Sequence, residues 1–132
     1  MITIYHLSTS RSERIVWLME ELGLEYQLAR HQREPSGAAP DAFKAIHPLG
    51  KAPLIRDGDT VLAESGAIVD YIVHRYGNDR LAVQPQAAEY ARYVYWLHFA
   101  EGSLMSLMLI ALVLSRVPEG APAPRVPACW RE

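Results

Sequence analysis

The chain of 132 residues carries a net charge of −2 at pH 7, with 50% hydrophobic and 21% charged residues. This composition allows a buried core and argues against disorder, while the charge gives no general attraction to nucleic acid or to an acidic membrane surface. The first residues lack the basic and apolar segments of a secretory signal. We therefore expect a cytoplasmic protein without a nucleic-acid partner.

The cysteine and histidine content predicts no metal centre. Cys129 is the single cysteine, which rules out an internal disulfide and a CxxC redox pair. The 5 histidines have no close ligand spacing, so we interpret them as scattered surface residues. They are His6, His31, His47, His74 and His98. Any redox chemistry must therefore use the sulfur of a ligand.

A strand and a helix open the chain. Ile2 and Ile4 alternate with polar or aromatic neighbours, which is typical of a short strand. The apolar residues then change to helical spacing. They are Ile15, Leu18, Met19 and Leu22. Ser10 or Ser12 is placed to cap the start of this helix, and Gly23 is placed to end it.

A second strand, a loop and a short helix follow. Tyr26 and Leu28 alternate with polar residues, which favours a strand. Residues 30–41 are rich in proline, glycine and charge and are expected to form an exposed loop. One or two helical turns over 41–46 should stop at His47, because the residue before a proline disfavours helical geometry.

The next segment predicts an antiparallel hairpin and a third helix. Leu54-Ile55 and Val61-Leu62 flank Asp57-Gly58, a pair typical of a type I′ turn. A wide apolar stripe then indicates a helix that ends at Gly77. Its members are Ile68, Val69, Ile72, Val73 and Tyr76.

This order of elements predicts an α/β fold. A βαβ unit followed by ββα within residues 1–80 is the arrangement of a thioredoxin-like domain, in which helices cover a mixed sheet. Residues 77–86 form a linker. Residues 87–117 are expected to begin an all-helical domain, as one long helix or two helices joined near Gly102-Ser103. The proline-rich tail, 118–132, is expected to be irregular.

The helical segment contains an almost wholly apolar stretch, 104–114. A membrane-spanning helix needs about 20 predominantly apolar residues, so we expect this shorter stretch to pack against protein and not to enter a membrane. Trp17 and Trp96 lie at helical positions and are expected to pack in the core or at a domain interface, as large aromatic side chains usually do.

Three separated motifs resemble those of the glutathione S-transferase superfamily. They are SRSERIVWLMEELGLEY over 10–26, GKAP over 50–53, and Glu64-Ser65 followed by AIVDYI over 67–72. The resemblance extends from Met1 to about Val117 and is strongest to the serine-type members of bacteria and fungi, including those of yeast. It implies a homodimer that uses glutathione as co-substrate. It also implies a truncated chain, because the family continues into a complete helical bundle.

The resemblance assigns roles to residues of each motif. Ser10 is the expected catalytic residue, whose hydroxyl stabilises the glutathione thiolate beside a helix start. The backbone of Ala52 pairs with the ligand's cysteine, and the family favours a cis bond before Pro53. The start of a helix attracts a carboxylate. Ser65 is therefore expected to bind the carboxylate of the ligand's amino-acid head group, and Glu64 is expected to bind the ammonium of the same head group.

Several alternatives remain at this site. Thr9, Ser12 or Tyr5 can replace Ser10 as the thiol contact, and the serines can equally act only as helix caps. Lys51 can bind the glycine carboxylate of the ligand, helped by the basic loop. The residues of this loop are Arg30, His31, Gln32 and Arg33. The same charges can also be solvated surface groups.

The expected function is a glutathione transferase that directs the activated thiol at a hydrophobic electrophile. The alternative is a non-catalytic glutathione-binding or interaction module, or an inactive truncated homologue. A glutaredoxin-like reductase is disfavoured because no cysteine occurs near residues 8–14.

Overall fold

The computed structural model describes residues 1–118, 120 and 121. A mixed sheet of four strands has the order β2-β1-β3-β4. Its strands are β1 (Ile2–Leu7), β2 (Tyr26–His31), β3 (Leu54–Asp57) and β4 (Thr60–Ala63). β1 pairs in parallel with β2 and antiparallel with β3, and β3 pairs antiparallel with β4. This is the predicted βαβ-ββα arrangement, so the thioredoxin-like α/β fold is confirmed.

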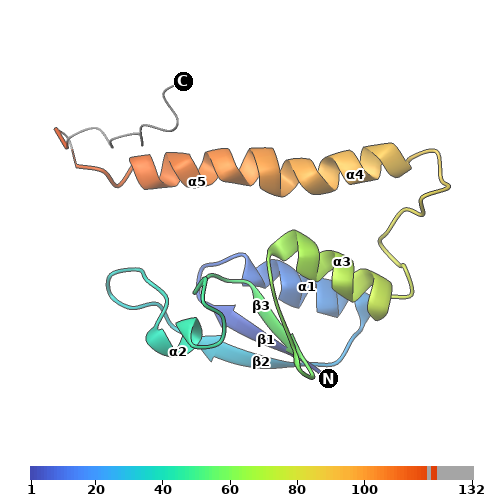
Figure 1. Cartoon of the computed structure of the whole chain (residues 1–132), viewed down its shortest axis with the longest axis horizontal. Coiled ribbons are helices and arrows are strands. Elements are labelled where there is room, and N and C mark those ends of the chain that lie inside the picture. Colours follow the sequence, from blue (N-terminus) through green and yellow to red (C-terminus); the bar gives the residue numbers. More distant parts are fainter. Residues whose placement is uncertain (119, 122–132) are drawn as a thin grey trace.

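Helices lie on both faces of the sheet, and two of them lie together on one face (Figure 1). The first face carries α1 (Ser12–Leu22) and α3 (Ser65–Arg75), and the second carries the single turn α2 (Asp41–Lys44). Successive side chains of β1 point to opposite faces of the sheet, so this strand contributes to a core on each face. The first core contains Ile2, Ile4, Ile15, Met19, Leu22, Ile55, Ile68, Ile72 and Val73. The second contains Leu7, Ala39, Phe43 and Leu54.

Two details differ from the sequence predictions. The turn between β3 and β4 consists of Gly58 and Asp59, because Asp57 still pairs with Thr60. Gly58 has a φ of +56° and Asp59 is not in the left-handed region, so a type I′ turn, which needs positive φ at both positions, is excluded. β2 also continues to His31, so the exposed loop begins after the predicted residue 30.

The hairpin is tied to α3 through Asp57. Tyr71 and Tyr76 both donate hydrogen bonds to Asp57 Oδ2, and the distance from the Tyr71 hydroxyl is 2.7 Å. Hydrogen bonds from Tyr76 and Tyr71 favour the charged carboxylate and lower the pKa of Asp57. The hydrogen bond to Asp57 raises the pKa of Tyr71 to about 12. The carboxylate therefore joins the end of β3 to α3 and to the residue that follows this helix.

A long helix follows the linker. α4 (Tyr90–Phe99), the π-helical turn η1 (Ala100–Leu104) and α5 (Met105–Leu114) form one continuous run of helix. The predicted junction near Gly102-Ser103 is thus a π-turn within one helix. Figure 1 shows this helix crossing the side of the domain that carries α1 and α3. Only Pro118, Gly120 and Ala121 of the predicted tail are described, and the rest lies outside the described residues.

The helix from Tyr90 to Leu114 has 25 residues, and a stretch of 18 residues within it has a mean hydropathy of 1.8, so by length and composition it is long and apolar enough to cross a membrane. Residues 104–114, on which the sequence-based expectation rested, are too few to span a membrane by themselves. In the structure α4 and η1 extend this stretch into one longer helix, so its length does not exclude a membrane span. The core helix of a larger helical domain has the same composition. Trp17 and Trp96 are 68% and 52% exposed in this chain, so neither lies in its core.

Candidate functional site at one edge of the sheet

Strand pairing brings the three sequence motifs to one edge of the sheet. Tyr5, near the end of β1, pairs with Leu54 at the start of β3, and Leu54 pairs with Ala63 at the end of β4. The loop after β1, the Ala52-Pro53 segment before β3 and the Glu64-Ser65 segment after β4 therefore leave the sheet at the same edge. Residues separated by more than fifty positions in sequence meet there because β1 and β3 are antiparallel.

The loop that carries Ser10 is held by bonds to its backbone. Ser8 donates from its amide to the carbonyl oxygen of His31 over 3.2 Å. Arg33 donates to the carbonyl oxygens of Ser8 and Thr9 over 2.9 and 3.2 Å, and to Gly37 over 2.9 Å. The Arg33 guanidinium therefore binds backbone groups of this chain. Thr9 is exposed and has a φ of +53°, an uncommon conformation for a β-branched residue.

Ser10 belongs to a short chain of hydrogen-bonded side chains. Its Oγ lies 2.7 Å from Ser12 Oγ and accepts the amide hydrogen of Ser12 over 3.2 Å. Ser12 Oγ in turn lies 2.8 Å from His6 Nδ1. Ser12 is fully buried, whereas Ser10 is half-buried. Ser10 thus contacts the amide of the first residue of α1, but the cap residue of this helix is Arg11 and no side-chain hydrogen bond caps the helix start. Part of the surface of Ser10 remains accessible.

The segment before β3 contains a cis peptide bond between Ala52 and Pro53. Pro53 is buried and Ala52 half-buried, whereas the side chain of Lys51 is exposed. The geometry that the family resemblance implied for this bond is therefore present. Lys51 reaches solvent beside the same edge of the sheet.

The start of α3 lies directly after the end of β4. Ser65 is the first residue of the helix and is 4% exposed. Glu64 precedes it as an exposed residue with a φ of +70° and a ψ of 119°. No side-chain hydrogen bond caps this helix start, so Ser65 does not serve as the cap. Backbone strain at a non-glycine residue of this kind concentrates at ligand-binding sites.

Tyr5 lies on the other face of the sheet from His6. It packs with the second core, next to Leu7 and Phe43. Its hydroxyl accepts a hydrogen bond from Arg56 Nε over 3.0 Å. Arg56 pairs with Thr3, farther from the site along β1, so the Tyr5 hydroxyl is bound on the side of Thr3 and not in the Ser10 loop.

An acidic residue of the long helix reaches the start of α1. Glu101, in η1, forms ion pairs with Arg11 and Arg14, and the distance from Arg11 Nη1 to Glu101 Oε2 is 3.1 Å. A π-turn shifts side chains out of the regular helical order and frequently occurs at functional sites. The residue that follows Ser10 is thereby joined to the helical segment.

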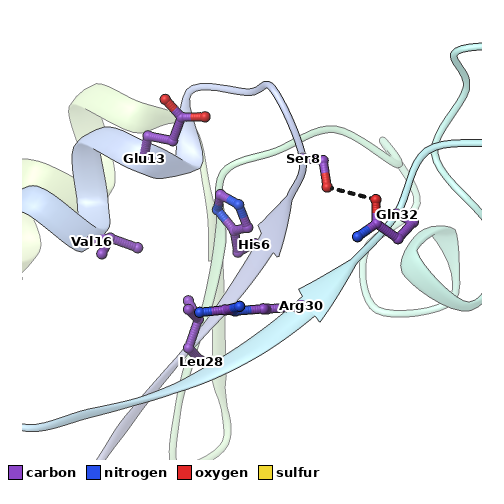
Figure 2. A pocket seen from close by; sticks show the side chains of 7 residues that line it. All are labelled: His6, Ser8, Glu13, Val16, Leu28, Arg30 and Gln32. Atoms are coloured by element: carbon purple, nitrogen blue, oxygen red, sulfur yellow. Dashed lines mark hydrogen bonds between the residues drawn. The ribbon is translucent and has the colours of Figure 1, made fainter.

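A pocket of about 360 Å³ lies between β1, β2 and α1. Figure 2 shows the side chains that line it, with the His6 ring between the strands and the helix. They are His6, Ser8, Glu13, Val16, Leu28, Arg30 and Gln32. No group of three or more potential metal ligands occurs within the described ranges. Of the residues expected to form a basic loop, Arg30 and Gln32 thus contribute to this pocket.

The fold and this edge define a thioredoxin-like domain with a cis-proline segment before β3. Residues 1–74 match the family model described as the glutathione S-transferase, N-terminal domain. The chain therefore belongs to the glutathione S-transferase family.

Relatives and solved structures agree with this assignment. A glutathione S-transferase of Schizosaccharomyces pombe is 40% identical over 86% of this chain and 47% of its own length. A crystal structure of one from Actinobacillus pleuropneumoniae is 46% identical, with a TM-score of 0.81 over 91% of this chain and 56% of that one. The chain thus spans about half the length of these relatives. A theta-class enzyme of Xanthomonas axonopodis with glutathione bound is 29% identical, with a TM-score of 0.65, over 91% of this chain and 58% of that one.

Two residues of the site were missed by sequence reasoning. His6 was interpreted as a surface residue, but it is half-buried and hydrogen-bonded to Ser12. The alternation of Ile2 and Ile4 indicated this, because the residue two positions on shares their face. Glu101 had no comparable signal, since its partners lie 87 and 90 positions earlier in the chain.

Proposed function

We propose that this chain binds glutathione at the sheet edge formed by Ser10, Ala52 and Ser65, and that it activates the thiol for attack on hydrophobic electrophiles. The convergence of the three motifs through the pairing of Tyr5, Leu54 and Ala63 carries this proposal. The glutathione bound to a related enzyme supports it. In this proposal residues 1–80 form the glutathione-binding domain, 87–117 begin the helical domain and 118–132 are a tail.

Each group of the tripeptide has a chemically suitable partner. The uncapped amides at the start of α3 and the buried Ser65 suit a carboxylate, and the adjacent Glu64 suits an ammonium group. The backbone of Ala52 suits pairing with an extended peptide. Lys51, exposed at the same edge, suits the glycine carboxylate. We assign the glycine carboxylate to Lys51 and not to Arg33, whose donors bind carbonyl groups of the Ser10 loop.

Ser10 is the proposed thiol contact. A free cysteine thiol has a pKa of about 8.5, so a hydroxyl donor beside a helix start is needed to favour the thiolate at neutral pH. The competing candidates fit less well. Ser12 is fully buried and the Tyr5 hydroxyl is bound to Arg56. Thr9 lies one residue farther from α1 than Ser10, whose hydroxyl contacts the first amide of that helix.

The test is a conjugation assay with glutathione and an aryl halide. The Ser10→Ala variant is expected to lower kcat/KM by about tenfold or more, because it removes the donor to the developing anion. Ser8→Ala is the matched control, since its hydroxyl binds the His31 carbonyl and Gln32 in the same loop. A wild-type chain that binds glutathione without any turnover would refute the transferase proposal.

A second candidate is a glutathione-binding module without transfer activity. All residues proposed for the tripeptide lie within 1–74, whereas α5 is exposed from Ser106 to Leu114 in this chain. Retention on immobilised glutathione without turnover of an electrophile would select this candidate. Loss of retention would contradict both candidates.

We also propose that the protein is a cytosolic homodimer whose long helix packs against protein. The large exposed apolar side chains of α5 support association, because soluble proteins rarely leave such surface uncovered. Light scattering at micromolar concentration is expected to give twice the mass of one chain. A monomer under these conditions would contradict the dimer.

A further inference from the structure

His6, Ser12 and Ser10 form a continuous path of hydrogen bonds from the sheet to the proposed thiol contact. The path runs from His6 Nδ1 to Ser12 Oγ over 2.8 Å and on to Ser10 Oγ over 2.7 Å. It begins on β1, crosses the first residue of α1 and ends in the loop between them. Its middle member is 0% exposed, so bulk water does not compete for these bonds.

The number of hydrogens limits how this path can be arranged. A serine hydroxyl has one hydrogen to donate and two acceptor positions. The amide of Ser12 already occupies one acceptor position of Ser10 Oγ. If the Ser12 hydroxyl donates to the other position, the hydrogen of Ser10 remains available for a ligand. If Ser10 instead donates to Ser12, its hydroxyl cannot donate to a thiolate.

The protonation of His6 Nδ1 decides between these two arrangements. A protonated Nδ1 donates to Ser12 Oγ, so that Ser12 must direct its own hydrogen elsewhere. Ser10 Oγ is its better acceptor at 2.7 Å, because the carbonyl oxygen of Leu7 lies 3.4 Å away. An unprotonated Nδ1 would accept from Ser12 and leave Ser12 free to accept the hydrogen of Ser10.

We propose that His6 is a positioning residue whose Nδ1–H group, acting through Ser12, directs the Ser10 hydroxyl outward to the glutathione thiolate. This inference rests on the function proposed above. No bond to the protein forms or breaks: the thiol loses its proton to water, and Ser10 keeps its own hydrogen. Either an imidazolium or the neutral ring protonated at Nδ1 satisfies the requirement.

The surroundings of the imidazole permit this role. The ring lines the pocket together with Glu13 of α1 and Arg30 of β2 (Figure 2). The pocket gives solvent access to the ring on the side away from the thiol site. His6 therefore links a solvent-exposed pocket to a hydroxyl on the far side of a buried serine.

The experiment titrates the thiolate absorbance of glutathione bound to the full chain. His6→Leu removes the donor, leaves Ser12 free to accept the hydrogen of Ser10, and is expected to raise the pKa of the bound thiol by about one unit. Ser12→Ala removes the hydroxyl that competes for this hydrogen, so the thiol pKa is expected to stay near the wild-type value in Ser12→Ala and in the His6→Leu/Ser12→Ala double variant. His6→Asn is expected to restore the wild-type value, because its amide nitrogen can occupy the place of Nδ1. Ser10→Ala gives the thiol pKa that is expected when the hydroxyl of residue 10 no longer contacts the thiolate.

Affinity for S-methylglutathione is the control, because this ligand has no thiol to ionise. It is expected to stay within twofold of wild type in His6→Leu and Ser12→Ala, which excludes damage to the peptide site. If His6→Leu does not fold, His6→Ala, which also removes the donor, takes its place. A raised thiol pKa in Ser10→Ala, with a wild-type value in His6→Leu, would overturn the role of His6 and leave the proposed function intact. A wild-type chain that does not bind glutathione, or a Ser10→Ala variant with an unchanged thiol pKa, would overturn the proposed function itself.

Discussion

Glu64 combines a proposed ligand contact with a backbone conformation that favours glycine. Its φ of +70° and ψ of 119° lie outside the regions that side chains readily adopt. Such residues cost about 1–3 kcal/mol and persist where the surrounding structure holds them. Here β4 ends at Ala63 and α3 begins at Ser65, so a single residue must make the whole change of direction.

Replacing Glu64 should separate stability from binding. Glu64→Gly is expected to raise the free energy of unfolding by about 1 kcal/mol, because it removes the strain at positive φ. Glu64→Ala retains the Cβ atom and is expected to give no such gain. Both variants should weaken glutathione binding by about tenfold or more, since the ligand's ammonium loses its charged partner. Denaturant unfolding and calorimetry measure these effects, and an E64G variant less stable than E64A would contradict the argument.

At the scale of elements, α1 ends in a hydrogen-bonded cap that requires glycine. Gly23 has a φ of +66°, and its amide donates to the carbonyl of Glu20 while that of Leu24 donates to Met19. Gly23→Ala is expected to lower the free energy of unfolding by about 1 kcal/mol. Gly102→Ala is the control, because Gly102 has no left-handed conformation and a Cβ atom there meets nothing within 4 Å. Equal effects of the two substitutions in thermal unfolding would contradict this assignment.

The bond between the hairpin and α3 predicts a pH dependence of stability. The pKa of Asp57 is lowered in the folded chain by Tyr76 and Tyr71, so its contribution is present above the ordinary value of 3.8 and is lost as pH falls through the folded pKa. Asp57→Asn is expected to lower the free energy of unfolding at pH 7 by about 1–3 kcal/mol.

The Asp57→Asn variant should also lose less stability than wild type upon acidification. Asp59→Asn, in the adjacent turn, removes an exposed carboxylate and is the control. Urea unfolding at pH 7 and near pH 3 measures both effects. Parallel pH profiles of wild type and Asp57→Asn would show that the two tyrosines do not stabilise the carboxylate.

At the scale of the whole molecule, Glu101 joins the long helix to the domain. Its side chain is 27% exposed and its partners Arg11 and Arg14 are 32% and 40% exposed. Ion pairs of this exposure contribute less than about 1 kcal/mol, so their removal should alter the position of the helix more than the stability of the fold. The contact also links this helix to the residue after Ser10.

Glu101→Gln is expected to increase amide hydrogen exchange in α4 and in the linker, 77–86, with little change in the exchange of the sheet. High salt should have the same effect on the wild-type chain, because it screens partly exposed charges. Glu89→Gln removes a charge at the start of α4 and is the control. Unchanged exchange in α4 of the Glu101→Gln variant would show that other contacts hold the helix.

Local sequence patterns determined the order of the elements, the mixed sheet and the family. These features depend on periodicity and on glycine and proline, which act over a few residues. The predicted turn, Asp57-Gly58, lies one residue before the observed turn. Asp57 is of a residue type that suits a turn, but in the folded chain it ends β3 and accepts hydrogen bonds from Tyr71 and Tyr76, which lie outside the hairpin. Trp17 was expected to pack in the core or at an interface because its side chain is large. The sequence does not show that this side chain points from α1 toward solvent.

At the candidate site, local sequence motifs identified some residues, and the tertiary structure alone showed the contacts between them. Ser10, Ala52 and Ser65 were recognisable because each lies in a local motif of the chain. Only the folded chain decided that Ser12 is buried, that His6 lies beside it, and that Glu101 reaches Arg11. Those contacts depend on which faces of a strand and two helices come together. Packing sets such distances through the whole core, so no pattern of neighbouring residues contains them.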